Sequence, residues 1–119
     1  MTPNLKVHEP IEHENRKTFE SGAQRSTDAD HARYDLVPRA AIEFMARTLK
    51  EGAERYGEQS WRKGIPSSDL WNHLLQHAYK WIDGDRSEDH LGHLMCNAAF
   101  LCHFHQDEIN KIYENNAAQ

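Results

Sequence analysis

The stretch SEDHLGHLMCNAAFLCHFHQDEINKI, residues 87–112, carries the strongest helical pattern in the chain. Its apolar side chains recur every three or four residues, which places them on one face of a helix. These residues are Leu91, Leu94, Met95, Ala98, Leu101, Cys102, Ile109 and Ile112. Ser87 is a suitable N-cap, with Glu88 and Asp89 in the first turn that follows. The stretch therefore predicts one long helix from Ser87 to Ile112.

Two further helices are predicted upstream, on either side of a loop at residues 58–67. Pro38 is suited to the first turn of one helix and Gly57 to its end. Ser67 or Ser68 can cap the other, which Gly84 should end. Their apolar faces comprise Ile42, Met45, Ala46, Leu49, Ala53 and Tyr56, and then Leu70, Leu74, Ala78 and Trp81. No stretch shows convincing strand alternation, so the predicted fold is an all-α bundle of three main helices.

The chain is long enough for one domain but lean in core-forming residues. It has 119 residues, of which 38% are hydrophobic, and a mean hydropathy of −0.91. Residues 1–20 show no hydrophobic period and are predicted to be a flexible arm, and residues 21–35 a polar loop. Residues 21–114 are predicted to form a single α-helical domain. Because three helices cover only a small core, we expect a homo-oligomer to complete the bundle.

Charge and cysteine usage limit the possible partners and compartment. The net charge of −5 argues against binding to nucleic-acid polymers, although a single nucleotide needs only a local group of cations. The sequence shows no signal peptide and no hydrophobic span, so a cytoplasmic protein without membrane contact is expected. Cys96 and Cys102 are six residues apart in one predicted helix, which favours buried thiols over a disulfide bond.

Nine histidines are present, and several lie at helical spacing beside carboxylates. His73 and His77 are four residues apart on one predicted helix, and Asp89, His93 and Asn97 follow the same spacing on the next. Two such rows on adjacent helices would form a metal site. We expect a divalent ion (Mg, Mn, Co or Zn), and the imidazoles favour a transition metal over magnesium. The expected ligands are His73, His77, Asp89 and His93. Any one of these histidines is equally consistent with a surface imidazole or a helix-end hydrogen bond.

Other residues are candidates for catalysis and for substrate binding. Glu51 and Glu54 form a Glu-x-x-Glu pair that could supply a ligand or a base, although this spacing is common on solvated helices. Cations in the predicted loops suit phosphate oxygens, and aromatic rings there could stack on a base. The expected substrate-binding residues are Arg25, Arg33, Tyr34, Trp61, Lys63, His90 and Asn97. Trp61 has an equal alternative, which is to anchor its loop to the bundle.

Six motifs resemble a family found largely in phages, the dATP/dGTP diphosphohydrolase domain, which is linked to MazG-like all-α nucleotide pyrophosphohydrolases. The resemblance covers roughly residues 21–102, and its motifs read SGAQRSTDAD, ARYDLVP, EGAERYG, SWRKGIPSSDL, NHLLQH and GDRSEDHLGHLMCN. The resemblance implies an α-helical enzyme that uses a divalent metal to release pyrophosphate from purine deoxynucleoside triphosphates, in the host cytoplasm if phage-encoded. The residues that match the family pattern are Arg25, Arg33, Tyr34, Glu51, Tyr56, Gly57, Trp61, Gly64, His73, His77, Asp89, His90, His93 and Asn97.

The leading hypothesis is therefore a metal-dependent nucleotide phosphohydrolase with Glu51 and Glu54 as its catalytic carboxylates. One departure motivates a second hypothesis. MazG-like proteins pair Glu-x-x-Glu with a later Glu-x-x-Asp, and this chain has no clear second motif. A protein that binds a cyclic or signalling nucleotide without cleaving it, as a phage counter-defence, would not need that motif. A third hypothesis is a helical interaction module with a structural metal.

Overall fold

The computed structural model describes residues 16–26 and 32–117. The chain divides into an N-terminal unit that ends at Leu36 and a C-terminal unit that begins at Val37. The first 15 residues of the predicted flexible arm lie outside the described residues, and so do residues 27–31 of the predicted polar loop. No helix among the described residues is both long and apolar enough to span a bilayer.

The N-terminal unit contains a small β-hairpin that the sequence pattern did not predict. Strand β1 (Arg16–Thr18) pairs with β2 (Gln24–Ser26) in antiparallel register, with Lys17 opposite Arg25. Gly22 in the connecting turn has a φ of 90°, a conformation in which glycine meets no steric penalty. Three-residue strands are too short to show an alternating pattern, which explains why the hairpin was missed. A 3-10 helix, η2 (Tyr34–Leu36), follows.

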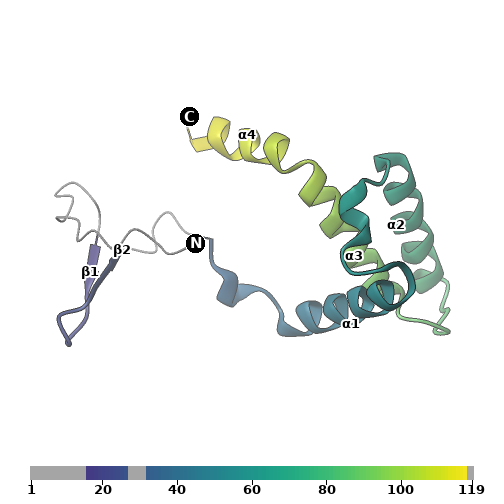
Figure 1. The fold of residues 1–119 in the computed structure, drawn as a ribbon, viewed down its shortest axis with the longest axis horizontal. Coiled ribbons are helices and arrows are strands. Elements are labelled where there is room, and N and C mark those ends of the chain that lie inside the picture. Colours follow the sequence, from purple (N-terminus) through teal and green to yellow (C-terminus); the bar gives the residue numbers. More distant parts are fainter. Residues whose placement is uncertain (1–15, 27–31, 118–119) are drawn as a thin grey trace. The chain divides into compact units, whose positions relative to one another are not determined.

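The C-terminal unit is entirely helical in the described chain, so the predicted fold class is confirmed there. Its elements are α1 (Arg39–Tyr56), the 3-10 helix η3 (Ser60–Lys63), α2 (Ser67–Ile82), α3 (His90–Phe104) and α4 (Gln106–Ala117). Helix α3 packs against both α1 and α2, whereas α4 follows the end of α3 and runs away from the other helices (Figure 1). Helix α3 is thus the central element of the unit.

The predicted third helix was wrong at its start and in its length. Asp89, not Ser87, is the N-cap, because its carboxylate accepts a hydrogen bond from Gly92 N at 2.9 Å. The backbone N–H of Ser87 instead donates to Asp85 Oδ1 at 2.8 Å. The helix also breaks at His105, so residues 90–112 belong to two helices. Neither glycine nor proline marks this break, and the apolar period continues through it.

The start of α2 also differs from the prediction. Pro66 is the N-cap, and its carbonyl oxygen accepts from Asp69 N and Leu70 N. Ser67 therefore lies inside the helix, and its hydroxyl makes a 2.8 Å hydrogen bond with His105 Nε2. This contact links the first turn of α2 to the junction between α3 and α4. Helix α1, by contrast, runs between Pro38 and Gly57 as predicted.

The core of the described chain is small. Its buried apolar side chains are Leu70, Cys96 and Leu101. Cys102 is exposed, so the prediction of two buried thiols was wrong for that residue, while both thiols are free as expected. Four residues of the predicted α1 core face are also exposed: Ile42, Ala46, Leu49 and Tyr56. The helices thus bury less apolar surface within one chain than their patterns predict.

Gly92 marks the closest approach of α3 to α1, and Gly52 provides a contrasting position. A Cβ on Gly92 would lie 2.3 Å from Asp89 Oδ2 and 2.6 Å from Thr48 Oγ1, whereas a Cβ on Gly52 would meet nothing within 4 Å. We expect Gly92→Ala to lower the free energy of unfolding by about 1–3 kcal/mol. Gly52→Ala should raise it by about 0.5–1 kcal/mol, since alanine favours a helix interior.

Denaturant unfolding of the two variants measures both effects. Opposite signs would support the packing of α3 on α1 through Gly92. A Gly92→Ala variant as stable as the parent protein would contradict that packing, because the added methyl group would then have found open space.

Candidate functional site

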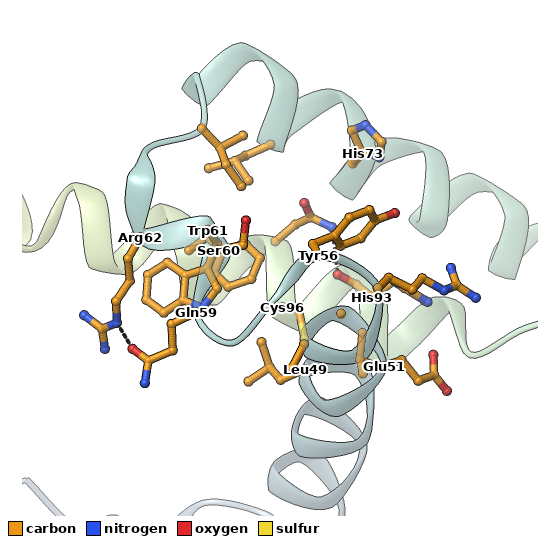
Figure 2. Close-up of a pocket in the computed structure, with 18 of the residues that line it drawn as sticks. Leu49, Glu51, Tyr56, Gln59, Ser60, Trp61, Arg62, His73, His93 and Cys96 are labelled. Atoms are coloured by element: carbon orange, nitrogen blue, oxygen red, sulfur yellow. Dashed lines mark hydrogen bonds between the residues drawn. The ribbon is translucent and has the colours of Figure 1, made fainter.

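An open pocket of about 1080 Å³ lies among α1, η3, α2 and α3. Figure 2 shows Trp61 and Arg62 of η3 on one side of it, His73 of α2 above, and Glu51 of α1 below. This volume is at the upper end of the range for small-molecule sites, which is about 300–1,000 Å³. A ligand as large as a nucleoside triphosphate is therefore compatible with the pocket.

Two histidines and a carboxylate converge at the α2–α3 side of this pocket. His77 of α2 and His93 of α3 stack with ring centroids 4.7 Å apart and planes 9° apart. Glu88 precedes α3, and its Oε1 lies 3.8 Å from His77 Nδ1 and 3.6 Å from His93 Nε2. One donor atom from each of the three side chains falls within 4.8 Å of the others. We call these three residues the His–Glu–His group; they could hold a metal ion.

His90 lies beside this group and is fully buried. Its Nδ1 is 2.9 Å from His77 Nδ1, and its Nε2 is 3.2 Å from Asp85 Oδ2. The Nε2 contact is an ion-pair distance without the geometry of a regular hydrogen bond. The sequence pattern did not predict that this histidine would be buried.

The electrostatic surroundings of the site favour a neutral His77 and an ionised Asp85. Burial, followed by the charge of neighbouring His93, lowers the pKa of His77 below its usual value of 6.5, while Glu88 acts in the opposite sense. Hydrogen bonds from the hydroxyl and backbone of Ser87 lower the pKa of Asp85 to about 2. A neutral imidazole has a lone pair for a metal, so His77 is suited to that role at neutral pH.

The structure brings together only part of the predicted ligand set. His77 and His93 meet as expected, but His73 is exposed, with its Nε2 3.7 Å from Asp69 Oδ2. The carboxylate of Asp89 caps α3, and Asp89 does not line the pocket. Glu88 supplies the carboxylate of the group instead, and sequence reasoning did not place it there. The signal that could have found it was the alternative N-cap at Asp89, which leaves Glu88 outside the helix.

The two glutamates of the Glu-x-x-Glu pair lie in different surroundings. Glu51 is exposed and lines the pocket. Glu54 does not line it, and its Oε1 is 4.0 Å from Lys50 Nζ in an ion pair along α1. Of the two, only Glu51 has direct access to a ligand in the pocket.

Three of the predicted substrate-binding residues line the pocket: Trp61, Lys63 and Asn97. The Trp61 ring stacks on Phe100 with centroids 4.8 Å apart and meets the edge of His103 at 4.9 Å, so it anchors η3 to α3. Asn97 Nδ2 donates to His93 O at 2.8 Å. Lys63 is exposed at the pocket. The ring contacts of Trp61 with Phe100 and His103 favour the alternative in which Trp61 anchors its loop.

Of the remaining four, His90 is buried and does not line the pocket, and Arg25, Arg33 and Tyr34 belong to the N-terminal unit. Arg33 forms a two-pronged ion pair with Asp35, through Nε and Nη2 at 2.8 Å each, and this pair lowers the pKa of the Asp35 carboxyl. Tyr34 is 83% exposed. Their roles in substrate binding stay predictions.

Cys96 lies at the base of the same pocket, from α3. Its thiol donates to Met45 O at 3.5 Å, and burial raises its pKa to about 11. At neutral pH the side chain is therefore a protonated thiol, which is neither a strong nucleophile nor a ready metal ligand. The His–Glu–His group thus remains the candidate centre of the pocket.

Comparison with known proteins gives one match. The family model for the N-terminal domain of dATP/dGTP diphosphohydrolases matches residues 21–112, which include α1, η3, α2, α3 and the His–Glu–His group. Neither a curated protein nor a solved structure matches the chain.

The lowered pKa of His77 has a consequence for stability. Below about pH 6.5 the unfolded chain binds more protons at this residue than the folded protein does, so the free energy of unfolding falls as the pH drops. We expect the melting temperature of the metal-free protein to fall between about pH 7.5 and pH 5.5, and to fall less in His77→Gln. Thermal melts with a chelator measure this. An equal fall in both proteins would show that His77 is not the residue responsible.

Proposed function

The chain belongs to the dATP/dGTP diphosphohydrolase N-terminal family, and from this membership and its pocket we propose that it hydrolyses purine deoxynucleoside triphosphates with a divalent metal, releasing pyrophosphate. The observation that carries the proposal is the convergence of His77, Glu88 and His93 at a pocket of nucleotide size. A catalytic metal needs an adjacent pocket for its substrate, whereas a purely structural metal does not.

The donor set fits a divalent transition metal. Imidazole nitrogens and one carboxylate suit zinc, cobalt, manganese or iron better than magnesium, which prefers oxygen ligands. His77, Glu88 and His93 would hold the ion, with Glu88 in the place that the sequence pattern assigned to Asp89. When bound, such an ion polarises a phosphoryl group and makes water a stronger nucleophile at neutral pH.

Cationic side chains around the pocket suit the triphosphate. Lys50, Arg55, Arg62 and Lys63 line it, from α1 and from the loop that contains η3. All four are exposed, so they can move onto phosphate oxygens without a large desolvation cost. Their charges would neutralise the pyrophosphate as it leaves. They would also allow a chain with a net charge of −5 to bind a polyanion locally.

Glu51 is the proposed general base. Glu51 lines the pocket from α1 and is exposed, so its carboxylate could accept a proton from the attacking water. The water oxygen forms a bond to the α-phosphorus, the proton passes to Glu51, and the bond between the α-phosphorus and the bridging oxygen breaks. The products are a nucleoside monophosphate and pyrophosphate.

Product analysis tests the reaction. The purified protein would be incubated with each deoxynucleoside triphosphate and with cyclic dinucleotides, in the presence of magnesium, manganese, cobalt or zinc. We expect purine monophosphate and pyrophosphate in equal amounts. A nucleotide recovered intact, and bound in proportion to the protein, would contradict hydrolysis and support the binding function instead.

Substitutions of Glu88 and Glu51 test the proposed metal ligand and the proposed general base. We expect Glu88→Gln to lower kcat by at least about a hundredfold, since an amide is a poor ligand and cannot balance a cation. Glu51→Gln should lower kcat by about a hundredfold with little change in KM. Glu54→Gln is the matched control, because Glu54 is on the same helix but outside the pocket.

Steady-state kinetics of the three variants, each checked for folding by circular dichroism, give the answer. A Glu88→Gln variant with the activity of the parent protein would rule out the His–Glu–His group as the metal site. A loss of activity in Glu54→Gln equal to that in Glu51→Gln would rule out the specific role of Glu51.

We further propose that the protein works as a homo-oligomer. On the outer face of α2, Trp71, Leu75 and Tyr79 form a row at four-residue spacing and are 52%, 45% and 63% exposed. We call them the α2 outer row. The described core buries only three apolar side chains, which is little for a stable chain of this length. A second copy, covering the same row by two-fold symmetry, would bury the missing apolar surface.

Substitution in the α2 outer row tests this interface. We expect Leu75→Glu to shift the protein from dimer to monomer, because a carboxylate in the centre of an apolar contact is left without a partner. Asn72→Glu adds the same charge one turn earlier on α2 and should leave the dimer intact. Light scattering after size-exclusion chromatography measures both masses. A parent protein that is already monomeric would contradict the proposal.

A further inference from the structure

The fully buried His90 has no role in the proposed reaction, although it lies against the metal site. A buried imidazole without polar partners is costly, so its contacts indicate why it is there. Within the described chain it has three polar neighbours at 4.0 Å or less: Asp85, His77 and Glu88. Asp85 lies on one side of the ring, at Nε2, and the other two lie at Nδ1.

The Asp85 contact fixes which ring nitrogen carries the proton. A carboxylate is ionised at neutral pH and only accepts hydrogen bonds. At 3.2 Å from Asp85 Oδ2, His90 Nε2 is the nitrogen on which a proton is favoured by the carboxylate charge. In a neutral imidazole, Nδ1 then carries the lone pair. That lone pair points to the side where His77 and Glu88 lie.

The distance between the Nδ1 atoms of His90 and His77 matches that between two ligands of one ion, whereas Glu88 is farther from His90 Nδ1. His90 Nδ1 is 2.9 Å from His77 Nδ1 and 4.0 Å from Glu88 Oε1. Ligand atoms that each lie about 2.0–2.1 Å from an ion are about 2.9–3.4 Å apart at octahedral and tetrahedral angles. The second ring nitrogen of a metal-binding histidine commonly lies beside a carboxylate, and Asp85 occupies that position beside His90 Nε2.

We propose that His90 is a further metal ligand, through Nδ1, and that Asp85 is the positioning residue that holds its ring. The centre then comprises three imidazoles and the Glu88 carboxylate, which narrows the ion to zinc, cobalt, nickel or iron and disfavours magnesium. This inference rests on the metal of the proposed function and adds a ligand to it. It also explains why a histidine is buried at this position.

Cobalt titration of the full-length, metal-stripped protein tests the ligand set without any nucleotide. The visible absorption of bound Co²⁺ reports its coordination, and competition with a chelator gives its affinity. We expect His90→Gln to weaken Co²⁺ binding more than about a hundredfold and to change the spectrum, and Asp85→Ala to weaken binding by about 10–100-fold. Asp85→Asn keeps an acceptor oxygen and should recover part of that loss.

His73→Gln is the matched control. His73 is also on α2 and lines the same pocket, but it is exposed and outside the His–Glu–His group. We expect its Co²⁺ affinity and spectrum to equal those of the parent protein. A His90→Gln protein that does the same would overturn the proposal.

X-ray absorption at the cobalt edge of the parent protein gives a second answer that needs no variant. Three imidazoles around the ion would support the proposal even if His90→Gln fails to fold, and two imidazoles would overturn it. A parent protein that binds no Co²⁺ would overturn both this inference and the metal site of the proposed function. Three imidazoles in a protein without nucleotide hydrolysis would overturn the enzyme proposal alone.

Discussion

The hydrogen bond from Gly92 N to Asp89 Oδ1 is the constraint on which the site depends. It starts α3 at His90, so that His90 and His93 are three residues apart in the first turn and face the same side. It also leaves Glu88 outside the helix, where its carboxylate lies near both His77 and His93. Had the helix begun at Ser87, Glu88 and His93 would stand about 140° apart around its axis. The cap therefore determines which carboxylate faces the histidines.

Gly92 makes this arrangement possible because it has no side chain. Its missing side chain leaves room for the Asp89 carboxylate and for Thr48 of α1, so the cap and the packing of α3 on α1 occupy one place. A helix interior usually disfavours glycine by about 1 kcal/mol relative to alanine. Here that cost is offset by close contact between the helices. The fold and the site thus share a single small residue at the start of α3.

The apolar periodicity of the sequence predicted the long, regular helices. It failed where a local contact determines the residue at which a helix begins. Helix α1 between Pro38 and Gly57 follows directly from its pattern and end residues. The pairing of His77 with His93 was also predictable, because both lie at the edges of apolar faces that must pack together. Glu88 and the burial of His90 were not, since both depend on the choice of Asp89 over Ser87 as N-cap. Both residues are possible caps in the sequence, and the position of Gly92 against α1, which only the folded chain supplies, decides between them.

The small apolar core and the cluster of possible metal ligands both affect the stability of the protein. A chain that buries few apolar side chains yet encloses His90 gains little stability from that region while it is metal-free. An ion bound there would stabilise the folded state alone, since the unfolded chain does not bring α2 and α3 together. Binding would also turn the close approach of His77 and His90 from a contact between two ring nitrogens into shared ligation. The same residues would then serve folding and chemistry, so affinity for the metal and stability of the α2–α3 contact should rise and fall together.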